Sequence, residues 1–428
     1  MNAPRSRLLL FLFGLAIVHG LIVNLMPVMF TTMDETFHLN KSNQAMLKAY
    51  FFGGSALALV FSGYLTQYLG ARWMSVILGC VAGAGAVMFG LAPTYPLVLL
   101  SAAVLAIGTM PLAAVYASLI ATRFSDVRQR VYMWTYAILA ISATIATTGL
   151  GWLLDVVGDY HIIFIVLGVV IWCWMALLLA ASWRALAPVV GPGQEVAVKR
   201  MVSRSGGPSH AGGKLHALWQ IVGSGVFNRG ALYLMMLLMI FDFLCVSNML
   251  AWTPTFFEQL YGGSKTIAGA SLSASSFGVA VGRIVMSTFP PGKVSDRMLL
   301  AACYTGGVIC FGLLVLLEPP YAVSLALMFL AGAFIAAQAP TMGSLAVAKF
   351  GQRAPVATPI YEAVGTVAGV VGPPLMGHLA DVTGQIRLVL LLVPLAGFAL
   401  AAIAWGWELY DRRTNVAGTL RVPSAESN

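Results

Sequence analysis

Long apolar runs separated by short polar breaks make up most of this chain. The runs from Met74 to Ala92 and from Leu388 to Trp405 are apolar on every face that a helix would present. Such a helix lies either deep in a core or in a membrane, and about 20 residues match the thickness of the hydrocarbon layer. The pattern therefore predicts membrane-spanning helices, because lipid requires each segment to satisfy its own backbone hydrogen bonds.

The polar breaks divide the chain into twelve predicted spans. They cover residues 8–30, 45–66, 74–92, 95–121, 132–154, 161–182, 231–254, 267–288, 298–317, 320–346, 357–380 and 386–408. We therefore predict an all-α membrane protein of twelve transmembrane helices in two six-helix bundles, residues 1–182 and 230–410. A Gly-, Pro- and Ser-rich linker, residues 183–229, joins them, and residues 411–428 form a tail. Within the linker, residues 214–222 fit either a plain tether or a short interfacial helix.

Composition excludes a water-soluble protein. Hydrophobic residues make up 59% of the chain and charged residues 9%, whereas soluble domains carry roughly 25% charged residues. The first apolar run continues to Phe30 without a cleavage site, which favours an uncleaved first span over a secretory signal.

The distribution of positive charge predicts the orientation. With the N-terminus in the cytoplasm, most of the 24 Lys and Arg residues fall in cytoplasmic segments. This asymmetry predicts that both termini are cytoplasmic and that the protein is a multi-pass protein of the bacterial inner membrane. The formal charge of +9 then reflects topology, and no nucleic-acid partner is expected.

An internal repeat relates the two halves. Leu154-Asp155-Val156-Val157-Gly158 recurs as Ala380-Asp381-Val382-Thr383-Gly384, and Asn24 has a counterpart in Asn248. The matches are collinear and fall in equivalent spans. A parallel duplication of this kind is typical of proteins in which two bundles rock around a site near the membrane midplane.

The clearest motifs lie in the eighth, tenth and eleventh spans. They read Gly282-Arg283, Gly332-Ala333-Phe334, Ala339-Pro340-Thr341 and Gly372-Pro373-Pro374. These motifs resemble those of the fucose/glucose/galactose-type sugar symporter family of the major facilitator superfamily. The resemblance implies the two-bundle fold, alternating access and a sugar or polyol substrate. Two features depart from it: Gln67 replaces the aspartate of the loop motif after the second span, and the first and fourth spans lack the family's acidic residues.

Ionisable residues inside predicted spans are the candidates for chemistry, because each is costly in a bilayer. His19, in the first span, is a candidate substrate ligand. Asp242, in the seventh, is a candidate proton-coupling residue, since its apolar neighbours disfavour the ionised form. For both, the alternative is a structural hydrogen bond between helices.

Two further charged residues fall at similar depth in the second half. Arg283 and Glu362 are predicted to form either a gate or a structural ion pair, and Glu362 is also a candidate for proton coupling. Lys48, near the outer end of the second span, is expected to extend its ammonium to the membrane surface.

Amides and aromatic rings could complete a polar cavity around these groups. The remaining predicted substrate-binding residues are Asn24, Tyr136, Asn248, Trp252, Gln338 and Tyr361. The alternative for each aromatic residue is ordinary packing.

The sequence thus predicts a secondary active transporter of a small polar solute, a sugar or polyol, with protons as the candidate coupling ion. Transport of an organic anion, with His19, Lys48 and Arg283 supplying positive charge, and uncoupled facilitation remain open, and a sensor of the same fold is a third alternative. Nucleotide, metal and nucleophile motifs are absent from the sequence, so we expect no enzyme and no cofactor. The expected partners are the substrate, protons and lipid, and we expect a monomer.

Overall fold

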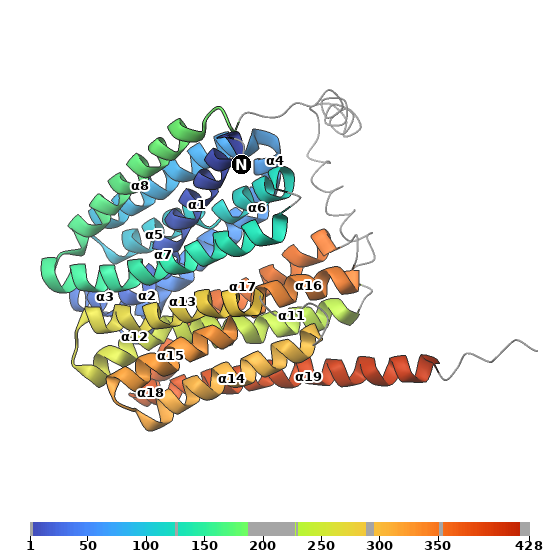
Figure 1. Ribbon diagram of the computed structural model, residues 1–428. Helices are drawn as coiled ribbons and strands as arrows, with labels where there is room; N and C mark the ends of the chain where they lie inside the picture. Colours follow the sequence, from blue (N-terminus) through green and yellow to red (C-terminus); the bar gives the residue numbers. More distant parts are fainter. Residues whose placement is uncertain are drawn as a thin grey trace, which may run out of the picture.

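The computed structural model describes residues 3–124, 127–186, 227, 230–287, 295–350 and 354–419. Across these residues the regular structure is helical, without strands. Figure 1 shows the helices in two groups, with the first half of the chain above the second.

Eight helices form the N-terminal bundle. They are α1 (Ala3–Val23), α2 (Leu25–Val28), α3 (Phe30–Phe37), α4 (Lys41–Leu91), α5 (Tyr95–Thr109), α6 (Leu112–Arg123), α7 (Arg128–Val157) and α8 (Tyr160–Ser182). Helix α4 contains two spans, and the chain turns between them at Gly70, with φ of 77° and ψ of 159°. A side chain would be strained at that φ, so glycine permits the turn.

The C-terminal bundle begins with a span in three parts: α11 (Gly230–Asp242), the π-helical segment η1 (Phe243–Ser247) and α12 (Asn248–Tyr261). The remaining helices are α13 (Lys265–Ser287), α14 (Asp296–Leu317), α15 (Tyr321–Ile335), α16 (Gln338–Phe350), α17 (Ala354–Thr383), α18 (Ile386–Leu390) and α19 (Leu392–Thr419). A π-helical segment interrupts the regular hydrogen-bond ladder and often occurs at functional positions.

The helices confirm the twelve predicted spans. Ten helical segments of the described chain are long and apolar enough to cross a membrane. The shorter apolar helix Tyr321–Ile335 and the first half of α4 complete the twelve. Large apolar side chains such as Ile145, Leu177 and Leu317 are 65%, 63% and 67% exposed, as a surface that faces lipid requires.

The two ends of the molecule differ. The start of α1, marked N near the top centre of Figure 1, and the end of α19, at the right, lie toward the same end of the two bundles, which we call the termini end. The α7–α8, α12–α13 and α14–α15 connections lie at the opposite, distal end. The predicted linker lies largely outside the described residues, as does its segment 214–222, and α19 extends to Thr419 within the predicted tail.

Candidate functional site

The two bundles meet along two helix pairs, α7 with α13 and α4 with α17. Glycines allow the close approach. A Cβ added to Gly151 would lie 2.2 Å from the carbonyl oxygen of Lys265, and one added to Gly377 would lie 2.6 Å from that of Lys41. Because the obstructing atoms belong to the backbone, any side chain at these positions would push the bundles apart at the distal end.

Asp155, at the distal end of α7, caps a helix of the other bundle. Its carboxylate accepts hydrogen bonds from the backbone N–H groups of Lys265 (2.9 Å) and Thr266 (2.8 Å), and from the hydroxyls of Ser264 and Thr266 (2.6 Å each). The first N–H groups of a helix have no partner within it and carry partial positive charge. Asp155 therefore ties the start of α13 to the N-terminal bundle.

Asp381 makes the reciprocal contact from the second bundle. Its carboxylate oxygens accept from the backbone N–H groups of Lys41 (2.8 Å) and Ser42 (2.9 Å), at the start of α4. These two aspartates are the residues that recur in the internal repeat, so the duplication places one cap on each side of the interface.

Further inter-bundle bonds lie beside the caps. Lys265 Nζ contacts Glu35 (2.7 Å) and Thr31 (2.8 Å) of the N-terminal bundle, and Glu258 (3.6 Å) of its own bundle. Ser273 bonds the hydroxyls of Thr147 (2.7 Å) and Thr148 (2.5 Å). We call the inter-bundle contacts of Asp155, Asp381, Lys265 and Ser273 the distal seal. They hold this end of the interface shut.

Closer to the termini end, four aromatic residues of the N-terminal bundle face a guanidinium. His19 Nδ1 lies 3.4 Å from the Tyr116 hydroxyl, the Tyr116 and Tyr136 rings pack edge to face, and the Tyr132 hydroxyl lies 3.4 Å from that of Tyr136. Arg283, from α13, donates to the Tyr136 carbonyl at 3.4 Å, with its guanidinium 5.1 Å from the ring centre. We call His19, Tyr116, Tyr132, Tyr136 and Arg283 the tyrosine cluster.

The members of the tyrosine cluster differ in solvent exposure. His19 and Tyr116 are 7% and 0% exposed, whereas Tyr132, Tyr136 and Arg283 are half-buried. In the described part of the chain, no carboxylate lies within ion-pair distance of Arg283. The guanidinium is thus a cation in the bundle interface whose contacts with the described residues are neutral.

Asp242 belongs to a second polar group, inside the C-terminal bundle. Its carboxylate accepts hydrogen bonds from the Tyr304 hydroxyl and, at 3.1 Å, from the Gln338 amide. The side chains of Asp242 and Tyr304 are 6% and 0% exposed. Gln338, predicted to bind substrate, therefore contacts the predicted coupling residue instead of projecting alone into a cavity.

The other predicted substrate ligands lie apart from the tyrosine cluster. Asn24 donates to Ser276 across the interface (3.3 Å), and Asn248 donates to the Leu244 carbonyl of its own span (2.7 Å). Trp252 is fully buried and donates to the Pro373 carbonyl (3.2 Å), and Tyr361 is 1% exposed. The structure thus brings His19 and Tyr136 together with Arg283, and places these four side chains in packing or interhelical contacts.

Two expectations need correction. The ion pair between Arg283 and Glu362 is not formed in this structure, because Arg283 lies against Tyr136 and the Glu362 side chain is exposed. Lys48 does not extend to the membrane surface: it is 5% exposed and donates to the Ser247 carbonyl of η1 at 2.7 Å. The close packing of α4 against the other bundle encloses the side chain.

Several residues of these polar contacts were not predicted as functional. Tyr116, Tyr132 and Tyr304 resemble ordinary packing residues in the sequence, whereas Asp155 and Asp381 carry a signal, their recurrence in the repeat. Both are the acidic residue in an Asp-x-x-Gly sequence that ends a span, and Gly158 and Gly384 adopt positive φ (71° and 69°) directly after α7 and α17.

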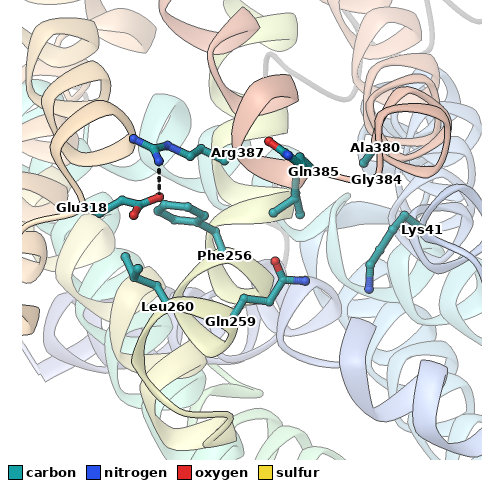
Figure 2. Close-up of a pocket in the computed structure, with 10 residues that line it drawn as sticks. Lys41, Phe256, Gln259, Leu260, Glu318, Ala380, Gly384, Gln385 and Arg387 are labelled. Atoms are coloured by element: carbon teal, nitrogen blue, oxygen red, sulfur yellow. Dashed lines mark ion pairs between the residues drawn. The ribbon is translucent and has the colours of Figure 1, made fainter.

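A cavity of about 340 Å³ opens at the distal end, away from the tyrosine cluster. Lys41, Phe256, Gln259, Leu260, Gln385 and Arg387 are among its lining residues, and the Arg387–Glu318 ion pair (3.0 Å) forms one wall (Figure 2). It lies beside the contact between Lys41 and Asp381 in the distal seal, apart from Arg283, so we do not assign it as the principal site.

Comparison with known proteins identifies the family and the fold. A family model described as Major Facilitator Superfamily matches residues 11–353. Two solved structures of a bacterial homolog of the human lysosomal transporter Spinster are similar, at 13% identity. The inward-facing, occupied form covers 95% of this chain and 97% of its own, with a TM-score of 0.68. The inward-facing, unoccupied form covers 94% and 97%, with a TM-score of 0.67. No curated protein sequence matches the chain.

Proposed function

The chain belongs to the major facilitator superfamily, a family of transporters, and on that premise we propose that its substrate is a small organic anion bound at Arg283. The observation that carries the proposal is the guanidinium in the bundle interface, which contacts Tyr136 and has no ion-pair partner among the described residues. A carboxylate ligand would supply the missing counter-charge, because a guanidinium binds a carboxylate through two parallel hydrogen bonds.

The other polar groups support an anion over a sugar. His19 and the hydroxyls of Tyr116, Tyr132 and Tyr136 can donate hydrogen bonds to carboxylate oxygens. The amides expected to hold a sugar, Asn24 and Asn248, donate to protein acceptors instead. The anion reading also agrees with the lack of carboxylates in the first and fourth spans.

The interface supports transport by alternating access. The distal seal closes one end, and Arg283 contacts the facing bundle nearer the termini end. With the termini in the cytoplasm, as the charge distribution predicts, the distal end faces outward and this conformation is closed to the outside. Rocking the bundles would break the seal and expose the site to the other side.

The proposal is tested by uptake into proteoliposomes of labelled mono- and dicarboxylates, with sugars and polyols in parallel. The unaltered protein should transport one or more carboxylates. Arg283→Gln should reduce uptake at low substrate concentration by roughly 30-fold or more, the usual cost of removing one member of a buried charge pair. Arg283→Lys should retain part of the activity, because it keeps the charge but not the planar fork.

Arg387→Gln is the matched control. It removes the same charge from a residue that pairs with Glu318 at the distal end, with the arginine side chain 43% exposed. Uptake by this variant should stay close to that of the unaltered protein. Transport of a sugar that is insensitive to Arg283→Gln would overturn the anion proposal and favour the sugar symporter alternative.

A further inference from the structure

Lys48 is buried between the bundles, and no carboxylate of the described residues forms an ion pair with it. Its Nζ donates to the Ser247 carbonyl at 2.7 Å and lies 5.5 Å from the centre of the Phe52 ring. Lys48 belongs to α4 of the N-terminal bundle, and Ser247 ends the π-helical segment of the C-terminal bundle. The single hydrogen bond described for this ammonium therefore crosses the interface.

The titratable groups around Lys48 are engaged elsewhere or are not bonded to it. On α17, Asp381 caps α4 and Glu362 is exposed; on α3, Asp34 and Glu35 pair with Lys41 and Lys265; on α12, Glu258 pairs with Lys265. The other described titratable side chains on α4, on η1 and on the helices packed against them are Tyr50, Arg72, Cys80, Tyr95, Tyr116, Arg123, Tyr160, His161, Cys173, Tyr233, Asp242, Cys245, Tyr261, Tyr361, His378, Glu408, Tyr410, Asp411, Arg412 and Arg413, with His38 directly after α3. No hydrogen bond or ion pair from these described groups reaches Lys48.

Two buried polar atoms next to Lys48 have no hydrogen-bond partner among the described residues. They are the Ser247 hydroxyl and the Asn248 Oδ1 atom. A water molecule bonded to these atoms could accept a proton from the ammonium or return one to the amine, since buried waters settle where several polar partners meet.

Lys48 and Asp242 differ in how rocking of the bundles would affect them. Tyr304 and Gln338, which bond Asp242, belong to its own bundle, so rigid-body rocking leaves these contacts intact. Lys48 bonds the opposite bundle, so opening of the distal end breaks the contact and admits water to the ammonium. A proton couples to a conformational change only through a group that binds it with different affinity in the two states.

We propose that Lys48 is the residue through which proton binding is linked to alternation between the two conformations. Water at the opened distal end stabilises the ammonium, whereas in the closed state the hydrogen-bond partner described for it is the Ser247 carbonyl, so protonation favours the distal-open state. The proton is taken from distal water onto the Nζ lone pair and returns to water after closure. The inference rests on the proposed transport by alternating access, and it assigns coupling to Lys48 rather than to Asp242.

The test measures distal opening directly. A cysteine at Ser264, within the distal seal, is labelled from outside with a membrane-impermeant maleimide between pH 6 and 9. The labelling rate of this cysteine is divided by the labelling rate of a cysteine placed at Val157, a position that is 45% exposed. The division removes the pH dependence of the thiol reaction itself. The corrected rate should rise several-fold as the pH falls, and in Lys48→Gln and Lys48→Arg it should be independent of pH.

Asp242→Asn is the comparison variant, and it should retain the pH dependence. Lys48→Arg keeps a charge that does not titrate, so it separates loss of proton exchange from misfolding if Lys48→Gln is not recovered. An unchanged pH response in both Lys48 variants, or its loss in Asp242→Asn alone, would overturn the inference.

Uptake driven by an imposed pH gradient provides a second measurement. Lys48→Gln should exchange carboxylate across the membrane but no longer accumulate it, whereas the unaltered protein should accumulate it several-fold. If the unaltered protein transports no carboxylate, the proposed substrate fails, while the labelling experiment still decides the role of Lys48.

Discussion

At the scale of single residues, His19 is almost completely buried and has one polar contact among the described residues. Its Nδ1 atom lies 3.4 Å from the Tyr116 hydroxyl, at the deep end of the tyrosine cluster. If the imidazole donates to substrate, His19→Ala should raise the KM for the transported anion about 2- to 10-fold, the usual value of one hydrogen bond. The maximal rate should change little.

Trp252→Phe is the matched control for His19→Ala. The indole is also buried and aromatic, but it donates to the Pro373 carbonyl in the C-terminal bundle. Trp252→Phe should leave the KM unchanged, whatever its effect on the amount of folded protein. An unchanged KM in His19→Ala would assign the histidine to packing.

Burial of polar residues could be predicted from the sequence, but their partners could not. His19 and Asp242 stand out because an ionisable group in an apolar run is costly. Tyr116 and Tyr304, which bond them, come from other helices, and the rotation of those helices is set by packing that hydropathy does not encode. For the same reason Lys48 was expected at the membrane surface, although it is enclosed.

At the scale of helices, the contact between α7 and α13 depends on Gly151. Gly151→Val should prevent full closure of the distal end, because the added Cβ would lie 2.2 Å from a backbone oxygen that cannot rotate away. The rate of maleimide labelling at a Ser264 cysteine should rise, and transport should fall.

Gly149→Val is the control on the same helix, since a Cβ at Gly149 meets nothing within 4 Å. Both variants place a β-branched residue in α7 at the same cost in helix propensity. Equal labelling of the two variants would mean that the close glycine contact does not limit closure.

The spans could be predicted because their length and apolarity follow from the bilayer. The helix breaks within the spans were harder to predict from the sequence. The break after α5 coincides with Pro111, whereas the π-helical segment Phe243–Ser247 has no proline or glycine to mark it. Gly365 and Gly369 of α17 pack against the Phe243 ring, so the contact between helices accompanies this irregular backbone.

At the scale of the whole molecule, the orientation predicted from charge can be measured. A fluorescent reporter that folds only in the cytoplasm should give signal when fused after residue 182 or after residue 428. Fusions truncated at Gly158 or at Glu318, both at the distal end, should be dark. Fluorescence from the distal fusions would reverse the orientation and with it the direction in which this conformation is closed.

The reciprocal caps of Asp155 and Asp381 have a consequence for how such a molecule could arise. Each half supplies a carboxylate to the first N–H groups of a helix in the other half, so the contact is isologous, as in a two-fold symmetric dimer. A six-helix ancestor carrying one aspartate and one helix start would have gained both contacts by pairing with its own copy. The two halves of the present chain, expressed as separate polypeptides, should accordingly find each other in the membrane.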